Sequence, residues 1–159
     1  MGKKLSNLLN WTWCLPQTLM GCCWLVTVRG LLDREAEDIG AWQGIRAIRY
    51  NKLQGGVSLG PFLFYQATPS GDTLLYHEYG HYRQSLLLGP LYIPLIGLPS
   101  FSWAIMKKAG FFQGIPYCAI PTERWVDRLA QSCIELENRK FMLGFVELMK
   151  KRQNVESQI

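Results

Sequence analysis

The stretch Thr73–Leu88, TLLYHEYGHYRQSLLL, says more about the fold than any other part of the sequence. Signals typical of helix ends lie on both sides of it. Asp72 is a residue type that caps helix N-termini, and Gly89-Pro90 cannot continue a helix. We therefore predict a helix from about Thr73 to Leu88, preceded by a turn at residues 68–72.

The centre of this predicted helix carries the motif HEYGH. At 3.6 residues per turn, His77 and His81 lie on one face, so their imidazoles converge on one point. Glu78 is too close to be a comfortable third ligand, but it can take a proton from a water held on a metal. Zinc lowers the pKa of such a water to about 7. These are the only two histidines in the chain, and we expect them to bind Zn2+ with Glu78 as the catalytic base.

A catalytic zinc takes three protein ligands and keeps one open position. The downstream carboxylates that could complete it are Glu123, Asp127, Glu135 and Glu137. Pro121 is expected to begin a second helix, with Thr122 as its cap. Glu123 and Asp127 lie four apart on that helix, so one can bind the metal while the other accepts the free N–H of a ligand histidine. The apolar stripe of this helix is predicted to be Trp125, Leu129, Cys133 and Leu136.

An HExxH motif followed by a separate helix with E-x-x-x-D resembles the gluzincins, the thermolysin-like clan of metallopeptidases. The resemblance implies that His77, His81 and Glu123 are zinc ligands and that Glu78 is the general base. It also implies that Asp127 is the hydrogen-bond partner of a ligand histidine, and that the substrate is a peptide or protein. The function expected from it is hydrolysis of peptide bonds.

Two wider runs, HEYGHYRQSLLLGPLYIPLIGLPS (residues 77–100) and PTERWVD (residues 121–127), resemble a group of small bacterial membrane-associated metallopeptidases. The similarity extends over about residues 55–130, half of the chain. The chain has no third histidine to match the one that stabilises the transition state in gluzincins. That role falls to a tyrosine or an arginine, or is absent; Tyr76, Tyr92 and Tyr117 are candidates through their proximity in sequence.

The composition indicates one domain over residues 1–159, because the length leaves little room for a second. Within it we expect an apolar N-terminal helix (1–30), a zincin-like core (50–137) and a basic amphipathic tail (138–159). The net charge of +5 comes without aromatic–basic interleaving, zinc-finger spacing or a phosphate loop, so no nucleic-acid partner is expected. The five cysteines are an odd number, and we expect buried, reduced thiols.

The expected fold class is helix-rich α+β: a minimal zincin-like core with a small sheet, an active-site helix and a second ligand-bearing helix. Gly55–Tyr65 (GGVSLGPFLFY) predicts one strand, bent or at a sheet edge because of Pro61. In zincins an edge strand above the active-site helix pairs with an extended peptide; this strand fits that place, or is an ordinary core strand. Arg34–Ile48 is expected to be a polar connection, in which Gly40 and Gly44 break any long helix.

Two uncharged stretches, Leu5–Val28 and Ser85–Met106, reach the roughly 20 residues that cross a bilayer. The first is predicted to span or lie on a membrane, and a core helix is the alternative. The second cannot cross fully if His81 and Glu123 share one ion, so we expect it to double back at Pro94 and Gly97. The expected location is therefore at a membrane, the bacterial inner membrane.

Three other interpretations stay open. The chain can be a non-catalytic zinc-binding or structural membrane-associated protein. Intramembrane site-two proteases also carry HExxH, but their third ligand is an aspartate in a later membrane segment, and no apolar segment after Met106 carries one. The last interpretation is a helical membrane protein that binds no metal and has the motif by accident.

Overall fold

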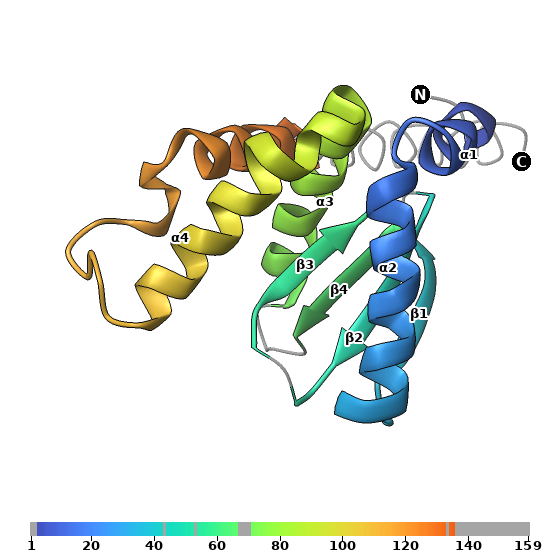
Figure 1. Ribbon diagram of the computed structural model, residues 1–159, viewed down its shortest axis with the longest axis horizontal. Helices are drawn as coiled ribbons and strands as arrows, with labels where there is room; N and C mark the ends of the chain where they lie inside the picture. Colours follow the sequence, from blue (N-terminus) through green and yellow to red (C-terminus); the bar gives the residue numbers. More distant parts are fainter. Residues whose placement is uncertain (1–2, 43, 53, 67–70, 133, 136–159) are drawn as a thin grey trace, which may run out of the picture.

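The computed structural model describes residues 3–42, 44–52, 54–66, 71–132 and 134–135 (Figure 1). Its α-helices are α1 (Lys3–Trp11), α2 (Leu15–Thr27), α3 (Gly71–Leu88) and α4 (Leu98–Lys108), and residues 121–132 are also helical. Its strands are β1 (Glu37–Trp42), β2 (Ile45–Tyr50), β3 (Gly56–Leu59) and β4 (Phe62–Gln66). They form one mixed sheet in the order β1-β2-β4-β3, so the expected helix-rich α+β fold is confirmed.

The sheet lies between α2 on one face and α3 on the other (Figure 1). Alternate residues of the two central strands serve the two faces, as the period of a strand requires. One core cluster joins Ile45, Ala47, Leu63 and Tyr65 to Leu75, Tyr79 and Tyr82 of α3. The other joins Ile48, Tyr50, Phe62 and Phe64 to Val28, Ala36 and the apolar side of α2. Burial on both faces explains why β4 reads as an unbroken apolar run.

Residues 34–48 are not a polar connection, and that expectation was wrong. Most of them form the antiparallel pair β1–β2, in which Glu37 pairs with Arg49 and Asp38 with Ile48. The charges that suggested a connection form ion pairs between the strands, including Arg46 Nε to Asp38 Oδ2 at 2.6 Å. Gly40 lies at a register shift in β1, and its φ of 87° is one that glycine adopts without strain.

The stretch Gly55–Tyr65 is two strands rather than one. It turns at Gly60 and Pro61, where Gly60 has a φ of 58°, and β3 pairs antiparallel with β4. The predicted edge position belongs to β3 alone, whereas β4 pairs with β2 as well and is central. The prediction of one bent or edge strand was therefore wrong for β4.

The N-terminal apolar stretch forms two helices. α1 ends at Trp11, and α2 begins at Leu15 and continues through a π-helical turn η1 (Val28–Leu32). Among the described residues, Leu15–Leu32 is the one helix that is long and apolar enough to span a membrane. The core helix of a soluble protein meets the same criteria of length and composition. One face of it packs on the protein: a Cβ added to Gly21 would lie 2.4 Å from the Leu59 carbonyl oxygen.

Pro94 and Gly97 do not reverse the chain, so the expected hairpin at these residues was wrong. After α3 the backbone turns at Gly89, which has a φ of 54°. It then passes through a 3-10 turn η2 (Gly89–Leu91) and a π-helical turn η3 (Ile93–Gly97) directly into α4. The reversal comes after Lys108, where residues 109–120 lead back to the 121–132 helix (Figure 1).

The ends of the two site helices differ in detail from the predictions. α3 begins at Gly71, so Asp72 lies in its first turn, and α3 ends at Leu88 as predicted. The second helix begins at Pro121 as predicted. Thr122 is inside its first turn and accepts a hydrogen bond from Ser100 Oγ at 3.2 Å.

The buried face of the second helix also differs from the predicted stripe. It consists of Glu123, Val126 and Ala130, while Trp125 and Leu129 are only half-buried. Cys133, Leu136, the turn at residues 68–70 and the tail 138–159 lie outside the described residues. The apolar contact of this helix is therefore centred on Val126, directly between Glu123 and Ala130 along the chain.

Candidate metal centre

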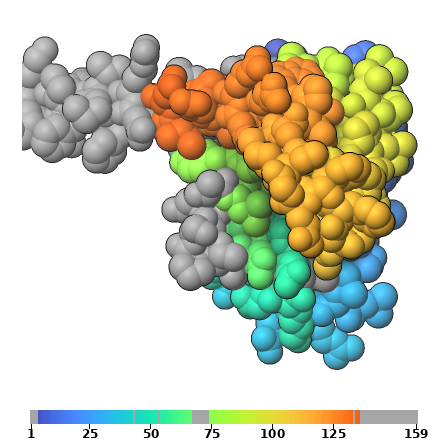
Figure 2. Space-filling view, turned by 90° about the vertical axis from the view of Figure 1, so that its left-hand side faces the viewer, coloured from blue at the N-terminus to red at the C-terminus, as the bar shows by residue number. Residues whose placement is uncertain are grey.

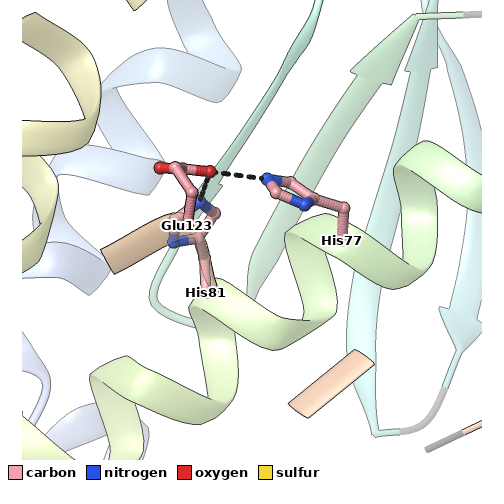
Figure 3. A group of neighbouring side chains, drawn as sticks. All are labelled: His77, His81 and Glu123. Carbon is pink, nitrogen blue, oxygen red and sulfur yellow. Dashed lines mark ion pairs between the residues drawn. The ribbon is translucent and has the colours of Figure 1, made fainter. Parts of the chain in front are cut away.

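Both histidines project from the same side of α3, as the i, i+4 spacing predicts (Figure 3). Their ring centroids are 5.1 Å apart. The side chain of His77 is 21% exposed and that of His81 is 9% exposed. The pair therefore lies at the boundary between the protein interior and solvent, which is where a ligand can reach it.

Glu123 comes from the 121–132 helix and points between the two imidazoles (Figure 3). Its Oε2 lies 3.1 Å from Nε2 of His77 and 3.7 Å from Nε2 of His81. One candidate ligand atom from each residue lies within 4.8 Å of the other two. The structure thus brings together the three residues proposed as ligands, although 42 positions separate His81 from Glu123 in the sequence.

The Glu123 carboxylate gives a test of whether this group suits a cation. The side chain is fully buried, and neither oxygen has a donor in hydrogen-bonding geometry among the described residues. A buried carboxylate in that condition is costly unless a cation or a proton compensates it. Two imidazole nitrogens and one carboxylate are also a donor set that zinc commonly accepts. The residues present therefore fit a metal ion.

Gly80 explains how the two helices come close enough for this contact. A Cβ added at this position would lie 2.7 Å from the carbonyl oxygen of Val126. Only glycine permits the backbone of the 121–132 helix to approach α3 so closely. The fourth residue of HEYGH is therefore a packing residue that sets the distance between the histidines and Glu123.

Each histidine has a hydrogen-bond partner on its Nδ1, which directs its Nε2 toward the centre of the group. His77 Nδ1 lies 3.1 Å from Asp127 Oδ1, the partner that the resemblance implied. His81 Nδ1 lies 3.0 Å from Gln84 Oε1. In this arrangement each Nδ1–H donates to an oxygen, and each Nε2 has a free lone pair.

Gln84 is a site residue that the sequence interpretation missed. It is fully buried and belongs to the same helix as His81, three positions further on. Its Nε2 donates a hydrogen bond to the Thr122 carbonyl oxygen at 3.1 Å, next to Glu123. One amide thus connects the helix of the histidines to the helix of the carboxylate. The only signal in the sequence was its i+3 spacing from His81.

Glu78 is buried beside the edge strand rather than exposed on α3. Its side chain is 4% exposed, and a Cβ added to Gly56 of β3 would lie 2.6 Å from its Oε1. Burial raises the pKa of Glu78 above its ordinary value, although the nearby His81 and His77 oppose the shift. A raised pKa suits a carboxylate that must first accept and then release a proton.

The electrostatics of the group favour a charged pair when no cation is bound. Burial alone lowers the pKa of His77, but Glu123, Glu78 and Asp127 outweigh it and raise the pKa to about 9. Burial alone raises the pKa of Glu123, but contacts with His77 and His81 hold it well below its ordinary range. A proton on His77 thus occupies the place that a cation would take.

Two of the three candidate tyrosines lie beside the group. Tyr92 is buried with its ring 6.4 Å from that of His81, and the half-exposed ring of Tyr117 lies 6.4 Å from that of His77. Burial, together with Glu78 and Glu123, raises the pKa of both phenols, so both keep their O–H donors. Tyr76 instead packs edge-on against Trp42 at 5.3 Å, in the core cluster on the sheet.

The remaining candidates do not join the group. Glu135 is exposed, and it is not part of the cluster of ligand atoms found among the described residues. Glu137 lies outside the described residues. Cys14, Cys22, Cys23 and Cys118 are free thiols, but Cys23 and Cys118 are exposed, so the expectation of buried thiols was wrong for these two.

Comparisons with known proteins gave no match: no protein-family model, no curated protein and no solved structure is similar to this chain at a significant level. The chemistry of the site therefore has to be argued from its own side chains.

Proposed function

We propose that this chain is a zinc-dependent metallopeptidase, similar in its site to the gluzincins, with His77, His81 and Glu123 as the zinc ligands. The observation that carries the proposal is the buried Glu123 carboxylate. Among the described residues no donor meets it in hydrogen-bonding geometry, and its Oε2 faces the Nε2 atoms of both histidines. Three protein ligands of this kind with one open position are typical of catalytic rather than structural zinc.

When bound, a zinc ion supplies Lewis-acid activation of a water and of a substrate carbonyl. Glu78 would take a proton from the attacking water and later deliver it to the leaving amine, as expected of a buried carboxylate with a raised pKa. Tyr92 or Tyr117 donates a hydrogen bond to the oxyanion, the role that the gluzincin histidine performs. Tyr117 is the more accessible of these two phenols.

The substrate in this proposal is a peptide or protein. The edge strand β3 lies against α3 beside Glu78, and its outer edge pairs with no other described strand. An extended peptide can add to such an edge by main-chain hydrogen bonds. We also propose that the protein acts at a membrane, which the helix Leu15–Leu32 supports by its length and composition.

Replacement of Glu78 by Gln separates catalysis from metal binding. We expect about one zinc per chain by elemental analysis in the wild type and in Glu78→Gln, because the side chain is not a ligand. Hydrolysis of a fluorogenic peptide library should fall by about 10²-fold or more in Glu78→Gln, since proton transfer typically contributes that much. Glu135→Gln is the matched control, because Glu135 is exposed and outside the group.

Hydrolysis that survives in Glu78→Gln would contradict the mechanism, and a wild type without zinc would contradict the proposal as a whole. A wild type that holds zinc and hydrolyses no peptide would instead support the non-catalytic zinc-binding protein. A specific observation keeps that alternative open: the site has no histidine for the oxyanion, because both histidines of the chain are ligands.

A further inference from the structure

Helix α4 and the loop after it carry a group of exposed apolar side chains. We call this group the α4 tip; it consists of Phe101, Ile105, Met106, Phe111, Phe112 and Ile115. Phe101 is 66% exposed and Phe111 is 61% exposed. The segment extends away from the sheet (Figure 1) and faces the viewer in Figure 2 (gold). Exposed apolar groups gathered in this way mark interaction surfaces.

The α4 tip is built to display these side chains. The ring of Trp103 stacks on Phe112 at 5.4 Å, and Trp103 Nε1 donates to the Tyr117 carbonyl oxygen at 3.0 Å. Lys107 Nζ donates to the Phe112 carbonyl oxygen at 2.9 Å and lies 5.9 Å from the Trp103 ring. The loop is therefore folded around Trp103 and Lys107. The other apolar side chains of the tip are exposed, although hydrogen bonds and ring stacking hold the loop in place.

The charged side chains of α4 and the loop after it are all basic. From Tyr79 to Thr122 the sequence contains no aspartate or glutamate, whereas Arg83, Lys107 and Lys108 are basic. Lys108 is exposed at the end of α4. Phenylalanine and tryptophan beside lysine are the combination that lies at the boundary between lipid tails and anionic headgroups.

We propose that the α4 tip binds the surface of an anionic lipid bilayer. The aromatic side chains enter the headgroup region, and the exposed Lys108 faces the lipid phosphates, whereas Lys107 is held by the loop carbonyl oxygens. This surface is distinct from the helix Leu15–Leu32, whose buried face packs on the sheet.

The α4 tip is adjacent to the candidate metal centre. Tyr117 joins the two, because its carbonyl oxygen accepts the Trp103 hydrogen bond while its ring lies 6.4 Å from that of His77. A bilayer bound at the tip therefore places the site at the membrane surface, where it meets peptide segments that emerge from lipid. This last step rests on the proposed peptidase function, whereas lipid binding by the tip does not.

Vesicle flotation of the full chain tests the proposal. The wild type should float with phosphatidylcholine vesicles that contain about a third phosphatidylglycerol, and much less with pure phosphatidylcholine. The double variant Phe101→Ser/Phe111→Ser should partition at least about tenfold more weakly, since each substitution removes a large apolar group from the lipid contact. Ile39→Ser is the control and should float like the wild type, because Ile39 is an exposed apolar residue of β1, outside both the α4 tip and the helix Leu15–Leu32.

A charge reversal tests the lipid phosphates separately. Lys108→Glu should weaken flotation with the anionic vesicles only, and Arg34→Glu, at an exposed position away from the α4 tip, should leave it unchanged. Zinc content and hydrolysis of a soluble peptide should be the same in the tip variants and the wild type. A failure of the peptidase proposal would appear in those two readings, and a failure of lipid binding only in flotation.

Two outcomes would overturn the proposal. One is equal flotation of the tip variant and the wild type, or an equal loss in the Ile39→Ser control. The other is self-association without vesicles that Phe101→Ser/Phe111→Ser abolishes, measured by sedimentation at several protein concentrations, because it would assign the surface to a second copy of the chain.

Discussion

The two halves of the candidate metal centre orient their histidines in different ways. On the inner half His81 is 9% exposed, and its partner Gln84 is neutral and fully buried. On the outer half His77 is 21% exposed, and the side chain of its partner Asp127 is 52% exposed. Both partners lie 3.0–3.1 Å from an Nδ1, so the difference is in charge and burial rather than in distance.

The physical reason is the cost of burying charge. A carboxylate beside His81 would need compensation inside the protein, and Glu123 already places one buried carboxylate there that depends on His77 or a cation for compensation. An amide orients the ring without adding charge, and its second group connects to the Thr122 carbonyl oxygen of the other helix. The inner half therefore determines how the helices fit together. On the outer half, Asp127 strengthens His77 as a ligand, and both side chains are in partial contact with water.

The largest effect is expected at Gly80, on which the fit of the two helices depends. In Gly80→Ala the new Cβ would lie 2.7 Å from the Val126 carbonyl oxygen, which belongs to rigid helix backbone. We expect a loss of roughly 1–3 kcal/mol of stability from overpacking, although alanine has the better helix propensity. Zinc affinity should fall with it, because Glu123 moves away from the histidines. Thermal unfolding and a chelator competition measure the two effects.

Gly30→Ala is the control for Gly80→Ala. Gly30 lies in the π-helical turn after α2, with nothing within 4 Å of an added Cβ. This variant should be as stable as the wild type or slightly more stable, with unchanged zinc content. Equal behaviour of the two variants would show that the close approach at Gly80 does not hold the site together.

The second effect concerns the inner half itself. Gln84→Leu removes the acceptor from His81 Nδ1 and the donor from the Thr122 carbonyl oxygen, so two buried groups lose their partners. We expect a decrease of roughly 10–100-fold in zinc affinity, the size usual for the loss of a ligand's hydrogen-bond partner. The visible spectrum of the cobalt-substituted protein should change as well, because the His81 ring is no longer oriented.

Two further variants show whether this loss comes from the hydrogen bonds. Gln84→Glu keeps an acceptor for His81 but loses the donor to Thr122, and it should bind zinc more tightly than Gln84→Leu. Gln113→Leu, at an exposed position in the loop after α4, should match the wild type. If Gln84→Leu and Gln113→Leu bound zinc equally well, the inner half would have no special role.

The part of the site that could be predicted from sequence is the part with helical spacing. His77 with His81, and Glu123 with Asp127, are i, i+4 pairs, and the helix period alone places each pair on one face. Pro121 and Gly89-Pro90 marked helix ends by their backbone chemistry. Gln84 also lies on the face of His81, at i+3. Because an amide carries no charge and is not a usual metal ligand, nothing in the sequence distinguished Gln84 from other polar residues.

The sheet was harder to predict because its evidence is not local. Arg46 and Arg49 made β2 look polar, although they pair with Asp38 and Glu37 across the hairpin. These partners are 8 and 12 positions away, and only the register reveals them. The predicted path of the chain from α3 to Glu123 was wrong for a related reason. Pro94 and Gly97 suggested a hairpin, but both lie in the π-helical turn that follows the 3-10 turn and leads directly into α4.

The smallest effect is expected on the outer half of the centre. In Asp127→Asn the amide oxygen still accepts from His77 Nδ1, and water screens the charge that is lost, because this side chain is half-exposed. We expect zinc affinity to fall by less than about tenfold, at the lower end of the usual range for such partners. The effect should shrink further at high salt, and thermal stability should hardly change.

Glu135→Gln, an exposed amide substitution further along the same chain, is the control for Asp127→Asn and should have no effect. If Asp127→Asn weakened zinc binding more than Gln84→Leu, the order of the two halves would be reversed. The charge of the exposed partner would then matter more than the buried amide that connects the helices.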